Sequence, residues 1–310
     1  MQQTILTDWK SDFVPKYGNE TLVLKHRLHE SELFTKEVLG ELIDRYPVEH
    51  YSLNTMGYDP ENPEWREGTI EGFSSENVFE AIEAGRMWLN LRCVDQVDDR
   101  YGRMLNDMFA EFEDKIPGLS TFKRKLGILI SSPKVQVFYH TDIPGQSLWQ
   151  IKGGKRIYVY PNKEPYLPQA DLETVVLGET EEEIPYHRSF DEAAEIYDLE
   201  PGQMVHWPLN CPHRVENKDD LSISLTTEHW TSDIRKSYAV NYANGVLRRK
   251  LRLNSLSQSI NGPMVYPKAA LAVAWRKIKL NESRKFVPVV DFTIDPKADT
   301  RITDIPAFAK

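Results

Sequence analysis

Cysteine is scarce in this sequence: the 310 residues include only Cys93 and Cys211. Both lie in apolar sequence surroundings, so we expect two buried thiols and no disulfide, as is usual in a reducing compartment. No run approaches eighteen consecutive apolar residues, so neither a transmembrane helix nor a membrane partner is expected. The first residues, MQQTILTDWKSDF, have no basic start and no apolar run, which argues against a signal peptide. Together these absences predict a cytoplasmic protein.

An excess of positive charge is also missing. Lys and Arg number 38 against 47 Asp and Glu, which gives a net charge of -9 and a pI of about 5.5. A chain of this overall charge offers no attraction to a phosphate backbone, so we expect no nucleic-acid partner. The hydrophobic share of 40% and the charged share of 27% are ordinary for a globular protein. The length suits one large domain, or one domain with appendages.

Both ends of the chain show helical periodicity. Apolar spacing and capping residues predict helices over Ser31–Tyr46, Ser75–Ala84, Gln96–Phe112, Ile234–Leu247 and Ala269–Leu280. The stretch Tyr51–Glu71 is rich in Pro, Gly, Asn and Glu, which predicts a long surface loop. The last thirty residues contain three prolines and are predicted to be extended and irregular.

The middle of the chain has short β-type runs separated by turn residues. After a strand over Met87–Val94, the predicted strands are Gly127–Ser131, Val135–His140, Ser147–Ile151, Arg156–Tyr160, Thr174–Val176, Met204–Trp207 and Ser222–Thr227. Short strands punctuated by Pro-Gly and Gly-Gly pairs favour a barrel or sandwich, such as a cupin or jelly roll. The expected fold is therefore mainly β with flanking helices. We expect a barrel core over 121–232, a mixed helix and strand extension over 1–120, and a helical region with an extended tail over 233–310.

One of the predicted strands runs into the triplet His140-Thr141-Asp142. Residues two apart in a strand point to the same face, so the imidazole and the carboxylate would project together. A set of two histidines and one carboxylate with open positions suits non-haem Fe(II). The third ligand should come from a later strand, and the stretch LEPGQMVHWPLNCPHRVEN offers both His206 and His213.

A lysine, Lys155, begins the next strand after Gly153-Gly154. A lysine at the start of a strand is usually solvated. One strand away from a metal triad, it could instead point into the barrel and pair with a dianionic co-substrate.

Two segments resemble the Jumonji C (JmjC) branch of the cupin superfamily, and most closely the Cupin_8-like hydroxylases of the factor-inhibiting-HIF type. The first combines HTD at 140–142 with QIKGGKR at 150–156, which leads into a strand that ends in proline. The second runs from PGQM at 201–204 through a tryptophan-proline pair to His213, Val215 and Asn217. The resemblance covers about residues 125–230 and implies a double-stranded β-helix barrel.

Carried over to this chain, the resemblance makes His140, Asp142 and His213 the iron ligands. It makes Lys155 the partner of the distal carboxylate of 2-oxoglutarate. The family usually adds a threonine hydroxyl three residues before the first histidine, and this chain has Val137 there. The candidates to replace that contact are Trp88, Asn90, Gln146 and Thr226.

The resemblance thus implies an Fe(II)- and 2-oxoglutarate-dependent dioxygenase that uses O2 to hydroxylate, or oxidatively demethylate, a substrate C–H bond. By similarity, a protein or peptide is the first choice of substrate, and a small molecule is the nearest alternative. A cupin enzyme that uses another metal without an oxo acid stays open, although Lys155 argues against it. A non-catalytic binding or regulatory module also stays open. The C-terminal helices would either form a homodimer or pack against the barrel as a bundle.

Overall fold

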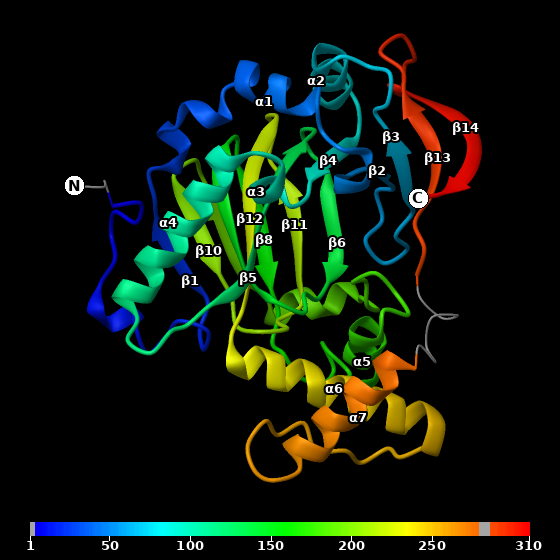
Figure 1. The fold of residues 1–310 in the computed structure, drawn as a ribbon. Helices are drawn as coiled ribbons and strands as arrows, with labels where there is room; N and C mark the ends of the chain where they lie inside the picture. The colour runs from blue at the N-terminus through cyan, green and yellow to red at the C-terminus, as the bar shows by residue number, and fades with distance from the viewer. Residues whose placement is uncertain (1–3, 279–285) are drawn as a thin grey trace.

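The computed structural model describes residues 4–278 and 286–310. Two β-sheets face each other, and helices cover the outer face and one end of the pair (Figure 1). The larger sheet has the strand order β1-β10-β7-β12-β5-β4-β2-β3-β13-β14, and the smaller has the order β6-β11-β8-β9. The predicted fold class, mainly β with flanking helices, is confirmed.

The strands are short and mostly antiparallel. The larger sheet contains β1 (Leu22–Lys25), β2 (Tyr51–Met56), β3 (Trp65–Thr69), β4 (Met87–Leu91), β5 (Phe122–Ser131), β7 (Gly145–Lys152), β10 (Gln203–His206), β12 (Ser222–Trp230), β13 (Val289–Ile294) and β14 (Ile302–Ala309). The smaller sheet contains β6 (Gln136–His140), β8 (Lys155–Val159), β9 (Glu195–Leu199) and β11 (His213–Asn217). The helices are α1 (Lys36–Ile43), α2 (Ser75–Ala84), α3 (Val94–Val97), α4 (Asp99–Lys115), α5 (Gln169–Leu177), α6 (Ser232–Leu251) and α7 (Val265–Lys277).

The eight strands from β5 to β12 form a double-stranded β-helix of the jelly-roll type. The chain crosses repeatedly between the sheets, so that four of these strands lie in each of them. Apolar side chains on the facing sides pack together between the sheets, among them Leu148, Ile157, Val205 and Val215. The two sheets thereby enclose an interior that is apolar in its middle.

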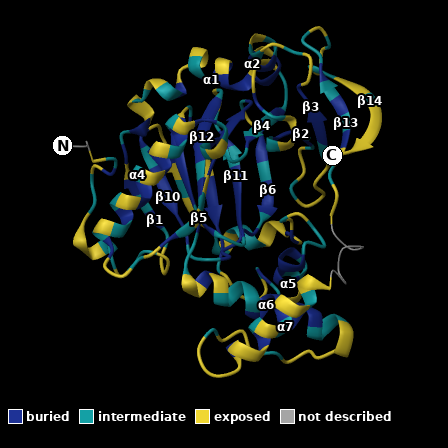
Figure 2. Cartoon of the chain, viewed as in Figure 1, coloured by how far each residue is buried: buried dark blue, intermediate teal, exposed yellow. Residues whose placement is uncertain are grey.

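The other face of the larger sheet packs against α4. Phe109 and Phe112 of this helix are buried in the same apolar cluster as Trp149 and Leu225 of the sheet. Polar residues of α4 remain on its solvent side, and the strands between the helices are almost uniformly buried (Figure 2). The helix predicted near 96–112 corresponds to α3 and α4, and α2 has the predicted bounds.

The last strands extend the sheet that the N-terminal region begins. Strand β13 lies parallel to β3, and the hydroxyl of Thr293 donates to the carbonyl oxygen of Thr69 at 3.1 Å. The prediction that the last thirty residues are irregular was therefore wrong for β13 and β14. The two strands pair with each other as an antiparallel hairpin, and β13 joins the sheet through β3, more than 200 residues earlier in the chain, a contact that no local pattern reports.

Two further predictions of local structure were wrong. Within the predicted loop Tyr51–Glu71, the residues Tyr51–Met56 and Trp65–Thr69 pair as strands, and only the segment between them forms the turn. The predicted strand Thr174–Val176 belongs to α5, where it is packed in an apolar cluster with Tyr242 and Val246 of α6. β-branched residues favour a strand locally, but tertiary packing overrides that preference here.

Helices α5, α6 and α7 lie together below the barrel in Figure 1. Ion pairs join α5 to α6, since Arg248 contacts the buried Glu173 at 2.6 Å. Helix α7 begins four residues before its predicted start, and the predicted positions 279 and 280 lie outside the described residues.

No helix in the described part of the chain is long and apolar enough to cross a bilayer. Cys93 and Cys211 are both free thiols, as predicted, but only Cys211 is buried, and Cys93 is partly exposed.

Candidate metal centre

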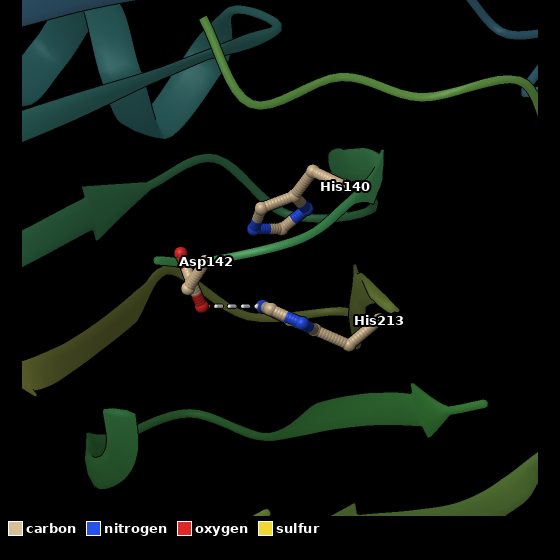
Figure 3. Close-up of side chains that lie close together, drawn as sticks. All are labelled: His140, Asp142 and His213. Carbon is tan, nitrogen blue, oxygen red and sulfur yellow. Dashed lines mark ion pairs between the residues drawn. The ribbon is translucent and has the colours of Figure 1, made fainter. Parts of the chain in front are cut away.

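The two histidines and the aspartate of the predicted triad lie together at one end of the barrel. His140 is the last residue of β6, Asp142 follows two positions later, and His213 is the first residue of β11. Because β6 and β11 are antiparallel, His140 and His213 face each other directly in the strand register. One ligand atom from each of the three residues lies within 4.8 Å of the other two (Figure 3). The set is the only such group of three or more His, Cys, Asp or Glu side chains among the described residues.

Hydrogen bonds fix which nitrogen of each histidine is free. Nδ1 of His140 lies 2.7 Å from the carbonyl oxygen of Phe138, and Nδ1 of His213 lies 3.1 Å from that of Cys211. A carbonyl oxygen only accepts, so each Nδ1 carries the hydrogen and each Nε2 presents a lone pair. This orientation by a backbone carbonyl is typical of histidines that bind a metal.

The carboxylate of Asp142 completes the convergence. Its Oδ2 is buried, has no hydrogen-bond donor in the described structure, and lies 3.2 Å from Nε2 of His213. Two buried acceptors therefore face each other, which is unfavourable unless a cation or a proton lies between them. Burial and the negative charge of Glu228 raise the pKa of Asp142, and burial with the neighbouring His140 lowers the pKa of His213. The residues present thus fit a metal ion with two nitrogen ligands and one oxygen ligand.

His206, the alternative third ligand, points the other way. Its ring stacks on Tyr17 with centroids 4.1 Å apart, outside the barrel, and its Nδ1 donates to the carbonyl oxygen of Gln146. The neighbouring side chains Val205 and Trp207 are the ones that pack between the sheets. Strand alternation therefore excludes His206 from the triad.

Asn210 holds the turn that carries Asp142, and sequence reasoning missed it. Its amide donates to the carbonyl oxygen of Asp142 at 2.7 Å, and the hydroxyl of Thr141 donates to the carbonyl oxygen of Asn210 at 2.9 Å. Asn210 has a φ of 59°, a conformation that asparagine tolerates better than most residues. The only signal in the sequence was an asparagine in a turn before Cys-Pro.

Lys155, the predicted co-substrate residue, lies inside the barrel. Its side chain is 1% exposed, and its Nζ lies 3.4 Å from the hydroxyl of Ser131, which also accepts from the amide of Asn217 at 2.8 Å. No acidic side chain in the described part of the chain pairs with Lys155, and burial lowers its pKa to about 7. An unpaired lysine at this depth provides a site for an anion. Neither Ser131 nor Asn217 was predicted to contribute here, because only the strand pairing brings them to Lys155.

The remaining predicted residues line one cavity of about 930 Å³ that also contains the triad. Asn90 and Thr226 approach each other across Gly127, where an added Cβ would lie 2.7 Å from the hydroxyl of Thr226 and 3.3 Å from Oδ1 of Asn90. This Oδ1 is buried and has no hydrogen-bond partner among the described residues, and the same is true of Nε1 of Trp88. Gln146 is placed beside the metal centre instead, because its side chain hydrogen-bonds Asp142.

An acidic segment borders the cavity beside the triad. Glu183 forms a β-bridge with His140, and the backbone N–H of Thr141 donates to the carbonyl oxygen of Glu182 at 3.1 Å. Burial and the nearby Asp142 raise the pKa of Glu182. Glu181, Glu182 and Glu183 thus form part of the wall of the cavity.

Comparison with known proteins gives structural relatives only. Neither a family model nor a curated protein matches the sequence. An X-ray structure of Escherichia coli ycfD is 17% identical, covers 92% of this chain and 71% of its own, and has a TM-score of 0.52. Two structures of E. coli YcfD, described as a ribosomal oxygenase, contain cobalt with 2-oxoglutarate (17% identity, TM-score 0.52) or with succinic acid (16%, 0.51). Each covers 90% of this chain and 69% of its own. At such identity the likeness shows a shared fold.

Proposed function

We propose that this chain is an Fe(II)- and 2-oxoglutarate-dependent oxygenase that hydroxylates a C–H bond of a protein or peptide. The observation that carries the proposal is the convergence of three lone pairs, from His140, Asp142 and His213, on one buried point. Three ligands on one side of an ion leave the opposite positions for a co-substrate and O2, which is the arrangement of non-haem Fe(II) oxygenases. Bound Fe(II) and 2-oxoglutarate would supply the activation of O2 for attack on the substrate.

Lys155 would hold the far carboxylate of 2-oxoglutarate. It is a deeply buried cation that the described residues leave without an acidic partner, and Ser131 lies beside it. Asn217 brings an amide to the same hydroxyl. We propose that Ser131 and Asn217 supply the polar contact that the family's threonine usually provides, because Val137 cannot. Asn90 and Thr226 would then contact the middle of the co-substrate or the substrate.

Two observations bear on the class of substrate. The structural relative YcfD is described as a ribosomal oxygenase and has been solved with 2-oxoglutarate, which favours a protein substrate. A cavity of about 930 Å³ that reaches the surface can admit a side chain presented by a polypeptide. Oxidative demethylation, a small-molecule substrate, a cytoplasmic location and a homodimer through α6 and α7 remain proposals of lower rank.

The first test is optical. Anaerobic addition of Fe(II) and 2-oxoglutarate should produce a weak visible metal-to-ligand charge-transfer band, and His140→Ala should abolish it. His187→Ala is the matched control, because His187 is exposed and belongs to no metal-ligand group in the described structure. A wild-type protein without the band, or a band that survives His140→Ala, would refute the iron site.

The second test separates an oxygenase from a binding module. In air, the wild type should convert 2-oxoglutarate to succinate even without substrate, and Asp142→Ala should lose this turnover. A band without succinate production would instead support a regulatory or binding protein. Mass spectrometry of a lysate treated with the enzyme, searched for products that have gained one oxygen atom, would then identify the substrate.

A further inference from the structure

The net charge of -9 conceals two regions of opposite sign. Residues 232–278, which contain α6 and α7, carry nine Lys and Arg side chains against a single acid, Asp233. Some of these cations have acidic partners, as Arg248 has in Glu173 and Lys236 has in Asp233. Arg235 and Arg276 are exposed and have no acidic partner among the described residues. The expectation of no attraction to a phosphate backbone rests on the average charge of the chain, and the charge of this region has the opposite sign.

These two arginines and Lys123 border the mouth of the catalytic cavity, each over an aromatic ring. Lys123 lies 5.8 Å from the ring centre of Trp230, Arg235 lies 5.6 Å from that of Phe122, and Arg276 lies 5.7 Å from that of Tyr238. All six side chains line the cavity. We call these six residues the basic-aromatic lip.

The three rings of the lip form one continuous strip. Phe122 and Trp230 are direct partners in the register of β5 and β12, and the rings of Trp230 and Tyr238 are 5.5 Å apart. The rings of Trp230 and Tyr238 meet edge to face, at 80°, and each of the three rings has a cation near it. Aromatic rings and cations together are the two elements that bind unpaired bases and their phosphates.

A β-bulge in the backbone at the lip changes the direction of its side chains. The register between β5 and β12 shifts between Glu228 and Trp230, so that Lys123 and Arg124 face a single residue. Lys123 has a φ of 49°, a left-handed conformation that is unfavourable for lysine. Bulges of this kind occur next to functional sites and redirect side chains. Here the bulge places Lys123 over Trp230.

We propose that the basic-aromatic lip docks single-stranded RNA. The cations would contact phosphates, and the rings would stack with bases, at the entrance to the cavity. An acidic peptide would satisfy the cations but would leave the aromatic strip without planar partners, so the rings favour nucleic acid. Unpaired nucleic acid in a cell is mostly RNA. The acidic remainder of the molecule confines a polyanion to this surface. The proposal does not depend on the oxygenase activity, because docking needs neither iron nor 2-oxoglutarate.

Binding of a fluorescein-labelled twelve-residue oligouridylate to the metal-free protein tests the proposal by anisotropy. We expect a micromolar Kd at low salt, with a log–log salt slope of about -2 if three phosphates are contacted. Arg235→Glu with Arg276→Glu should weaken binding at least tenfold. The control, Lys152→Glu with Lys297→Glu, changes the net charge equally at exposed sites outside the lip and should have little effect.

A second variant separates binding from folding. Lys123→Gly relieves the left-handed backbone, so the protein should be at least as stable, yet it should bind oligouridylate several-fold more weakly. If the control double variant loses as much affinity for oligouridylate as the lip double variant, the binding depends on net charge alone and the proposal is overturned. Tighter binding of an equally long poly-glutamate peptide would assign the lip to an acidic protein, and tighter binding of oligothymidylate would refute the preference for RNA. Absence of saturable binding in the wild type would also refute it.

Discussion

Glu173 and Lys155 are the most deeply buried charged side chains among the described residues, and they differ in how they are compensated. Glu173 is fully buried and accepts from Arg248 at 2.6 Å. Lys155 is 1% exposed, and within the described structure its ammonium group contacts the hydroxyl of Ser131, at 3.4 Å, and no acidic side chain. Burial of a charge without a counter-ion is unfavourable in free energy. At Lys155 an anionic ligand would offset this unfavourable term.

Removal of this ammonium group should therefore weaken co-substrate binding selectively. Lys155→Met keeps the apolar stem and deletes the charge, so we expect KM for 2-oxoglutarate to rise by roughly 30-fold, or about 2 kcal/mol. Steady-state succinate production measures this change, and Fe(II) affinity should stay the same. Lys152→Met, on the exposed end of β7, is the control. Equal KM values for Lys155→Met and wild type would show that the carboxylate binds elsewhere.

The depressed pKa of Lys155 also predicts a pH dependence. Burial lowers this pKa to about 7, so above that pH the empty pocket contains a neutral amine. A dianionic ligand favours the protonated form, and its binding should take up a proton. The apparent Kd for 2-oxoglutarate should be nearly constant below pH 7 and rise about tenfold per unit above it. Calorimetry in buffers of different ionisation enthalpy would reveal the uptake, and an affinity unchanged from pH 6.5 to 8.5 would contradict it.

The part of the site that could be predicted consists of residues that lie close together in the sequence. His140 and Asp142 are two positions apart, so strand alternation alone places them on one face. His213 could be distinguished from His206 mainly through the family resemblance, and the structure gives the physical reason, which is the side of β10 that His206 occupies. Ser131 could not be predicted, because its contact with Lys155 joins two sheets.

At the scale of elements, local signals succeeded where one segment determines its own conformation. Ser74 caps α2 by accepting from the backbone N–H of Asn77, and the helix follows its apolar periodicity. The composition of Tyr51–Glu71 predicted a loop because the segment is rich in turn residues. Those residues form only the turn of a hairpin, and the residues on both sides of it form strands. The residues Thr174–Val176 were predicted as a strand from their local preference, but they form part of helix α5, which packs against helix α6. Only for Thr174–Val176 does the deciding partner lie outside the segment.

Strand β13 depends on one close fit. Phe292 is fully buried, and its ring lies over Gly68 of β3, where even a Cβ would come within 2.3 Å. Phe292→Ala should therefore destabilise the protein by about 3–5 kcal/mol through lost burial and a cavity. Urea unfolding measures the change, with Phe308→Ala on the exposed side of β14 as the control. If both variants unfold at the same urea concentration, β13 contributes little to the global stability.

At the scale of the whole molecule, buried histidines set its tolerance of acid. Burial lowers the pKa of His26 and of His206 to about 4. The unfolded chain protonates these rings below about pH 6.5, while the folded protein keeps them neutral, so stability should fall as the pH drops from about 6.5 to about 4. Each histidine contributes up to roughly 3 kcal/mol over this range.

Urea midpoints measured from pH 7.5 to 4.5 would test this dependence. His206→Gln should show a shallower slope than the wild type even if it is less stable at pH 7.5, whereas His187→Gln, at an exposed position, should keep the wild-type slope. A midpoint that is constant over the whole range would contradict the prediction.

The parallel pairing of β13 with β3 has a consequence for synthesis of the protein. Thr293 and Thr69 are 224 positions apart, yet their strands are neighbours in the sheet that continues into the cavity wall at β2 and β4. During translation, one edge of β3 stays unpaired until β13 has emerged from the ribosome. A nascent chain can therefore form the jelly roll and its metal ligands early, while the adjoining sheet is still open. Ribosome stalling before residue 289 would release a protein with a complete metal centre and an exposed strand edge, which is a template for aggregation.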